Sequence, residues 1–177
     1  MDGTCEIERA RIGRRGFRAG AVAVLPVLLA VGPFGLIFGI IAREAGLDLA
    51  QTMVMTATVI AGASQIAALQ LLSDGAPAAL AIFTGAVVNL RMAMYSASLA
   101  PWWQGAPLSL RLMVAPVLHD QSYALSVARY VRREESLSDR IGFYLAIGTI
   151  TASTWTLATL LGATLGVPHL TLFFSLS

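Results

Sequence analysis

The segment AGAVAVLPVLLAVGPFGLIFGIIA, residues 19–42, decides the fold of this chain. It carries no charged side chain, and about 20 such residues suffice for an α-helix to cross the hydrocarbon core of a bilayer. Uncharged runs of similar length recur at 49–73 and from Ile141 to the C-terminus. One water-soluble core could not bury so many runs in 177 residues. The sequence therefore predicts an all-α integral membrane protein.

The overall composition supports this class. Hydrophobic residues make up 56% of the chain and charged residues only 12%, against about 25% charged in a typical soluble domain. The twelve basic residues are all arginine, and arginines in short loops beside membrane helices set topology, so we expect no nucleic-acid partner. The single Cys5 cannot form an internal disulfide.

We expect about five transmembrane helices. They lie at about 19–42, 51–72, 77–101, 110–130 and 141–166. The arginine-rich segment 1–18 precedes them, and residues 19–177 form a single transmembrane domain. The first apolar run is too long for the h-region of a cleaved signal peptide, which has about 7–15 residues. It is therefore predicted to remain as the first span.

The distribution of arginine predicts the topology. Five arginines lie in 1–18 and four in 129–140, while the connections 43–50 and 102–109 hold one and none. Alternation through five spans places the N-terminus and the 131–140 connection on one side, and the 102–109 connection on the other. The positive-inside rule makes the arginine-rich side cytoplasmic. We therefore expect a multi-pass cell-membrane protein with a cytoplasmic N-terminus.

The C-terminal run is too long for one helix, and Gly166-Val167-Pro168 interrupts it. Leu170–Leu176 is therefore predicted to be a partial sixth span. A weak internal sequence repeat fits six spans. Pro26-Val27-Leu28 recurs as Pro116-Val117-Leu118, and Arg43-Glu44 recurs as Arg133-Glu134, both 90 residues later. Chance and common descent both explain it. If it reflects descent, the chain is an inverted 3+3 repeat with interrupted helices, as in many secondary transporters.

Four predicted spans carry polar or helix-breaking residues near their middle. Such groups are costly in hydrocarbon and tend to face a bundle interior or a water-filled cavity. Their common depth predicts one substrate site built from interrupted helices. The candidate substrate-binding residues are Gly32, Pro33, Phe34, Gly35, Ser64, Gln65, Asn89, Arg91 and Asp120. His119 and Asp120 are the candidate proton relay.

Arg91 and Asp120 supply one charge of each sign, as the carboxylate and ammonium of an amino acid require. Asn89 and Arg91 are two residues apart and point to nearly opposite faces of a regular helix. Both reach one cavity only if the helix is unwound there. Phe34 and Ile66 are candidates for the apolar wall.

Structural alternatives remain open for each of these features. Gly32-Pro33 can be a plain kink, and the small residues Ala57, Ala61 and Ser64 can serve helix packing. The side chains of Gln65 and His119 can be hydrogen-bonded structural groups. Arg91 and Asp120 can be a structural ion pair.

No enzyme signature is present: the chain has no GxSxG, no HExxH and no P-loop. His119 and His169 are its only histidines, too few for a metal site at one depth. We therefore expect a non-enzyme without catalytic residues, cofactor or metal.

Three motifs resemble a known family. They are PFGLIFGIIAREAGL (33–47), AGASQIAALQLL (61–72) and NLRMAMYSASLAP (89–101). Together, over about 17–168, they resemble the AzlC family of branched-chain amino acid permeases. The resemblance implies export of branched-chain or other small hydrophobic amino acids by secondary transport, together with a small AzlD-type membrane partner.

The sequence departs from the family pattern in three places. Residues 119–122 read HDQS where the family usually has TDES, and Met92 stands where a histidine usually follows NLR. The family also continues with further spans beyond residue 177. These departures leave an alternative open: a non-transporting truncated or accessory membrane subunit that assembles with a small partner.

Overall fold

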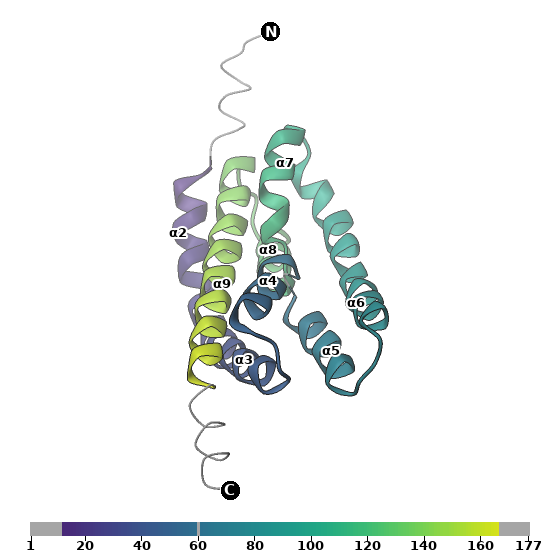
Figure 1. Ribbon diagram of the computed structural model, residues 1–177. Helices are drawn as coiled ribbons and strands as arrows, with labels where there is room; N and C mark the ends of the chain where they lie inside the picture. Colours follow the sequence, from purple (N-terminus) through teal and green to yellow (C-terminus); the bar gives the residue numbers. More distant parts are fainter. Residues whose placement is uncertain (1–11, 60, 167–177) are drawn as a thin grey trace, which may run out of the picture. The chain divides into compact units, whose positions relative to one another are not determined.

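The computed structural model describes residues 12–59 and 61–166, and all regular structure in this part of the chain is helical (Figure 1). The elements are α2 (Arg14–Ala23), α3 (Leu25–Glu44), α4 (Leu49–Thr58), α5 (Gly62–Ser73), α6 (Ala78–Leu99), η1 (Ala100–Trp103), α7 (Leu108–Val114), η2 (Ala115–Val117), α8 (Asp120–Tyr130) and α9 (Leu137–Leu165).

The helices belong to two compact units. Unit 1 contains Met1–Val27 and Arg91–Ala152, and unit 2 contains Leu28–Leu90 and Ser153–Ser177. Three helices, α3, α6 and α9, pass from one unit into the other.

The same three helices are long and apolar enough to cross a membrane. These stretches are Leu25–Glu44, Ala78–Trp103 and Leu137–Leu165, with mean hydropathies of 2.3, 1.4 and 1.3. The described part of the chain thus has three candidate spans, fewer than the five expected. The partial sixth span predicted at Leu170–Leu176 lies outside the described residues.

The helix α3 runs through Gly32 and Pro33 without a break, so the predicted interruption at 32–35 is wrong. Proline removes only one backbone N–H, and membrane helices tolerate this loss. The break in the first apolar run lies instead at Val24, the residue that joins α2 to α3, and this residue is fully buried.

In unit 2, α4 and α5 form a helical hairpin. The backbone of Val59 after α4 is non-helical, and the chain is extended at Ala61 just before α5. The helix α4 begins close after the end of α3, and Leu69 of α5 packs on Phe38 and Ala42 near that same end. The chain therefore enters along α4 and returns along α5 (Figure 1).

In unit 1, α7, η2 and α8 form a second hairpin. The inward arm follows α9: the Tyr144 hydroxyl donates to the Val114 carbonyl at 3.2 Å, and Val117 lies against Gly148. The returning arm, α8, starts beside Arg91 of α6. This arm then runs along α6 toward η1.

Contacts at the end of α8 close this hairpin. The Tyr130 hydroxyl donates to the Arg140 carbonyl at 2.6 Å, and the Tyr130 ring lies 5.9 Å from that of Trp102. Arg140 Nη1 donates to the Trp102 carbonyl at 3.2 Å. The 102–109 and 131–140 connections therefore lie at the same end of unit 1, and their predicted placement on opposite sides is wrong.

Hydropathy explains why five spans were expected where the described part of the chain has three candidates. A hairpin of two half-length helices has the same length and apolar composition as one full span, so 51–72 and 110–130 were each predicted to cross. The break at 59–61 also has no counterpart 90 residues later, where α9 is continuous. The 3+3 repeat is not confirmed. Each hairpin instead returns toward the C-terminal end of the span before it.

Glycines allow close packing against α9 in each unit. In unit 1, Asp139 Oδ1 accepts the Gly16 N–H at 3.0 Å, and a Cβ on Gly20 would lie 2.5 Å from the Phe143 carbonyl oxygen. Figure 1 shows α2 beside α9. In unit 2, Gly39 and Gly162 have no room for a Cβ between α3 and α9. Small residues four apart are typical of such membrane interfaces.

Candidate functional site

Gln65 joins the two arms of the hairpin in unit 2. Its side chain is fully buried, and its Nε2 donates to the carbonyls of Val59 at 2.6 Å and Met55 at 3.2 Å. The Met55 carbonyl also accepts the Val59 N–H at 2.9 Å, so Gln65 chiefly supplies a partner for the Val59 carbonyl, which lies beyond the last helical bond of α4. This contact agrees with the structural alternative for Gln65, while its substrate role stays a prediction. Its Oε1 is buried without a hydrogen-bond partner among the described residues.

Ser64 links the same tip to α6. Its fully buried hydroxyl donates to Asn89 Oδ1 at 2.9 Å. Ser64 stands in the first turn of α5, where backbone N–H groups lack helical partners and carry partial positive charge. Trp155 covers this turn, because a Cβ on Gly62 would lie 2.7 Å from its ring. The sequence analysis did not single out Trp155.

Ser122 builds the tip of the hairpin in unit 1. Its hydroxyl accepts the His119 N–H at 2.9 Å and lies at the same distance from the carbonyls of Val117 and His119, to which it can donate. The backbone is extended at Leu118 and His119, and α8 begins at Asp120. Ser122 is the serine that matches the family pattern, and its role here is to shape the break.

His119 is buried beside this tip. Its ring is 6% exposed, and neither ring nitrogen has a hydrogen-bond partner within the described part of the chain. The structure therefore shows neither the hydrogen-bonded structural histidine nor a direct bond to Asp120. The proton relay stays a prediction.

Arg91 and Asp120 face each other, as the sequence analysis requires. Arg91 Nη2 lies 3.1 Å from Asp120 Oδ2, and the two side chains are 29% and 42% exposed. Asp120 is the first residue of α8, where a negative charge is favourable. Arg91 Nε and Asp120 Oδ1 are buried without a hydrogen-bond partner among the described residues. The pair thus balances charge and leaves both a donor and an acceptor unused.

Two tyrosines extend this pair along α6 and α8. The rings of Tyr95 and Tyr123 stack with centroids 4.2 Å apart and planes 8° apart, and the Tyr123 hydroxyl donates to Ser98 Oγ at 3.1 Å. Tyr95 follows Arg91 by four residues and so shares its helix face. This spacing is the signal that could have identified Tyr95 from the sequence.

Asn89 and Arg91 lie in a continuous helix, α6. Asn89 binds Ser64 within unit 2, and Arg91 pairs with Asp120 within unit 1. No unwinding is needed, because each side chain has its own partner on its own face.

The candidate residues of the first span serve other purposes. Gly35 packs against Ala158, whereas a Cβ on Gly32 would meet nothing within 4 Å. Pro33 is exposed, and Phe34 is 51% exposed with its ring 6.2 Å from that of Trp155. Because α3 is continuous here, residues 32–35 form no helix terminus. Ile66, proposed for the apolar wall, packs on the core cluster around Phe38.

Comparison with known proteins places the chain in a family. A family model described as AzlC protein matches residues 26–167. An uncharacterized membrane protein of Archaeoglobus fulgidus is 31% identical over 144 residues, covering 78% of this chain and 64% of that protein. The inner membrane protein YgaZ of Escherichia coli is 26% identical over 152 residues, covering 85% of this chain and 61% of that protein.

The chain thus spans less than two thirds of the length of either relative. No solved structure matches it. The family match covers most of the chain, including both hairpins and all three candidate spans almost entirely. The chain is therefore a membrane protein that belongs to the AzlC family.

Proposed function

We propose that this chain is a membrane permease subunit that exports branched-chain or other small hydrophobic amino acids by secondary transport. The observation that carries the proposal is the Arg91–Asp120 pair at the start of α8, with Arg91 Nη2 3.1 Å from Asp120 Oδ2. Membership of the AzlC family, which is generally associated with amino acid transport, supports it.

The pair suits a zwitterion. The substrate carboxylate would take the place of Asp120 beside Arg91, and the substrate ammonium would take the place of Arg91 beside Asp120. Opposite charges make the empty site tolerable, since each partners the other until substrate arrives. The stacked Tyr95 and Tyr123 offer an adjacent apolar wall, and His119 is the proposed proton carrier next to Asp120.

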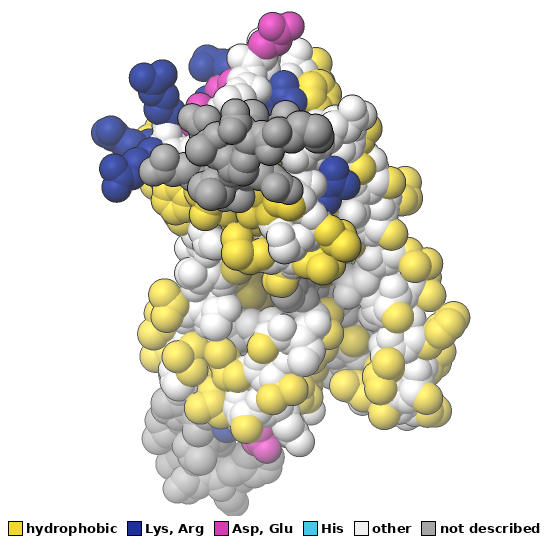
Figure 2. All heavy atoms as spheres, turned by 90° about the horizontal axis from the view of Figure 1, so that it is seen from above, with side chains coloured by type: hydrophobic (Ala, Val, Ile, Leu, Met, Phe, Trp, Pro, Cys, Tyr) yellow, Lys and Arg dark blue, Asp and Glu magenta, His cyan; other side chains and the backbone are white. Residues whose placement is uncertain are grey.

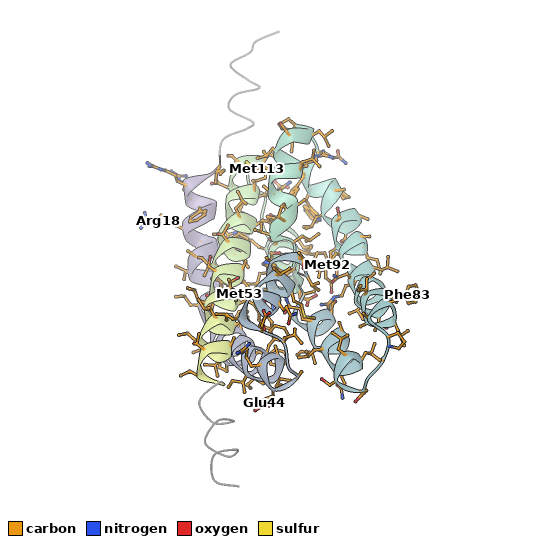
Figure 3. The ribbon with its side chains drawn as sticks, in the orientation of Figure 1. Arg18, Glu44, Met53, Phe83, Met92 and Met113 are labelled. Carbon is orange, nitrogen blue, oxygen red and sulfur yellow. The ribbon has the colours of Figure 1, made fainter. Side chains whose placement is uncertain are left out.

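The arginine distribution supports a cytoplasmic N-terminus. Residue 13 and the 131–140 connection meet in unit 1, where the Gly13 N–H donates to the Ser138 carbonyl at 2.8 Å. Arg14, Arg15 and Arg18 are exposed, and Figure 3 shows Arg18 pointing away from α9. On the face drawn in Figure 2, several arginine side chains lie together at the upper left of the view, and hydrophobic side chains are spread among other residue types over the rest. The contact of residue 13 with the 131–140 connection brings arginine-rich parts of the chain together, as the positive-inside rule expects of one side of a membrane.

We also propose a small membrane partner of the AzlD type, because the family resemblance implies one. A second candidate function is a non-transporting accessory subunit that assembles with such a partner.

Transport by vesicles tests the proposal. The full chain, with and without the small partner, is reconstituted, and uptake and efflux of labelled leucine and valine are measured. We expect Asp120→Asn and Arg91→Gln each to lower transport at least about tenfold, since each removes a charge-assisted contact. Asp74→Asn, at an exposed acid after α5, is the matched control and should transport normally.

Charge reversal separates a site from a structural bridge. Arg91→Asp combined with Asp120→Arg should restore folding at best, because an arginine at the start of α8 opposes the helix dipole. Transport should stay lost, since the charges face the wrong ends of the substrate. Full transport by the doubly reversed protein would overturn the proposed site.

A further inference from the structure

We propose that Arg111 and the cavity beside it form a second site, which binds the carboxylate of a small apolar acid or amino acid. The site lies in unit 1 and contains none of the residues assigned to substrate so far. The choice of ligand class rests on the proposed function. A substrate would bind at this second site before it reaches the Arg91–Asp120 pair.

The cavity is small and has one charge. Its volume is about 130 Å³, and its walls include Ser96, Leu99, Trp103, Arg111, Leu118 and Tyr144. The remaining lining residues are alanines, so no acidic side chain faces it. A cavity of about 150 Å³ admits a benzene ring, so the branched side chain of leucine is of suitable size.

Arg111 is held in place at this cavity. Its Nη2 donates to the Trp103 carbonyl at 2.8 Å, and its Nε is buried without a hydrogen-bond partner among the described residues. Trp103 itself is fixed, because its ring meets that of Tyr144 edge to face at 4.8 Å.

The charge of Arg111 has no counter-ion in the described part of the chain. The ion pairs found there are Arg91–Asp120 and Arg129–Glu135. A cation in the apolar segment LSLRLMV is costly unless an anion accompanies it. A bound carboxylate would supply that anion, and a planar guanidinium suits its two oxygens.

The position of the cavity relates it to transport. Its Trp103 wall adjoins Trp102, whose carbonyl binds Arg140 at the end that we propose to be cytoplasmic. Its Leu118 wall lies two residues before Asp120. A substrate moving from the cytoplasm would therefore meet Arg111 before the charged pair, and it would meet a site that recognises the carboxylate but not the ammonium.

Binding of 4-methylpentanoate tests this site, because that acid has the side chain and carboxylate of leucine but no ammonium. The full chain is placed in phosphatidylcholine nanodiscs, and labelled acid and labelled leucine are titrated. Arg111→Gln keeps an amide donor for the Trp103 carbonyl but removes the charge. It should weaken binding of the acid at least about tenfold. Arg111→Lys should retain most binding, and Arg132→Gln, at an exposed arginine, should change nothing.

A second variant keeps the test valid if Arg111→Gln does not fold. Ala115→Leu places side-chain volume in the cavity wall without touching the arginine, and it should weaken binding of the acid to a similar extent. Asp120→Asn should lower leucine transport at least about tenfold and leave the Arg111-dependent part of 4-methylpentanoate binding unchanged, which separates the two sites.

The outcomes distinguish the two proposals. Equal binding of the acid by the native protein and Arg111→Gln would overturn the Arg111 site, even if leucine transport persists. Retention of phosphatidylglycerol by Arg111 without any binding of the acid would make it a lipid-headgroup site and also overturn the inference. Arg111-dependent binding of the acid without any leucine transport would leave the carboxylate site standing and refute the proposed function.

Discussion

Three polar side chains stabilise the tips of the two hairpins, and these are Gln65, Ser122 and Asp120. Gln65 donates to the last carbonyls of α4, Ser122 accepts the His119 N–H, and Asp120 places a negative charge at the start of α8. Where a chain turns inside a membrane, no water is present to hydrogen-bond the free backbone groups. Other residues of the chain must therefore provide their partners. Polarity at mid-span predicted that Gln65 and Asp120 matter, whereas Ser122 was noted only as a match to the family pattern. It could not predict their partners, because depth and helix face do not identify the neighbouring backbone.

Removing the amide of Gln65 should destabilise the protein. Gln65→Ala removes the side-chain donor of the Val59 carbonyl, which costs about 1–3 kcal/mol of unfolding free energy, while the Met55 carbonyl keeps the Val59 N–H. The measurement is the unfolding midpoint in detergent or nanodiscs. Gln70→Ala, at an exposed position of the same helix, is the control and should have a much smaller effect. Equal midpoints for the two variants would contradict the role given to Gln65.

At the scale of single helices, two elements differ from what residue patterns predicted, and the reason is the same for both. The helix α3 is continuous although Gly32 and Pro33 suggested a break, and 51–72 is a hairpin although its hydropathy suggested a span. Hydropathy records how apolar a segment is, and it carries no information on whether the chain reverses. A glycine likewise signals either a break or a close contact. Only the neighbouring helix decides which, as α9 does for Gly39.

Two glycines of α3 should therefore respond in opposite ways to alanine. Gly39→Ala forces its Cβ onto backbone atoms of Thr159 and Ala163, so it should cost about 1–3 kcal/mol. Gly32→Ala meets nothing within 4 Å and should leave stability unchanged or raise it by about 0.5–1 kcal/mol, since alanine favours the helix. Unfolding midpoints of the two variants check this. A larger loss for Gly32→Ala would contradict the packing of α3 on α9 within unit 2.

At the scale of the whole molecule, the distribution of arginine agrees with the contacts between the connecting segments. This agreement is better with 110–130 as a hairpin than with five spans. The sequence analysis placed the N-terminus and the 131–140 connection together, and the bond between Gly13 and Ser138 agrees. It separated the 102–109 connection because it counted 110–130 as a crossing. With that segment as a hairpin, Arg111, Gly13 and the 131–140 connection lie toward one end of unit 1. The difference arises in one segment, 110–130. Its effect is to move the 102–109 connection to the other side of the membrane.

Cysteine labelling in membrane vesicles tests this revised topology. In a background with Cys5→Ser, single cysteines replace Gln104, Ser136 and Asp74, all exposed in the structure. The Arg140–Trp102 contact predicts that Gln104→Cys and Ser136→Cys react from the same side, which the arginine distribution makes cytoplasmic. Asp74→Cys should react from the opposite side, because the apolar stretch Ala78–Trp103 crosses between it and Gln104. A membrane-impermeant maleimide added to right-side-out and inside-out vesicles gives the readout. Reaction of Gln104→Cys and Ser136→Cys from opposite sides would restore the crossing at 110–130 and remove the second hairpin, and the tip at His119–Asp120 would then lie within a span.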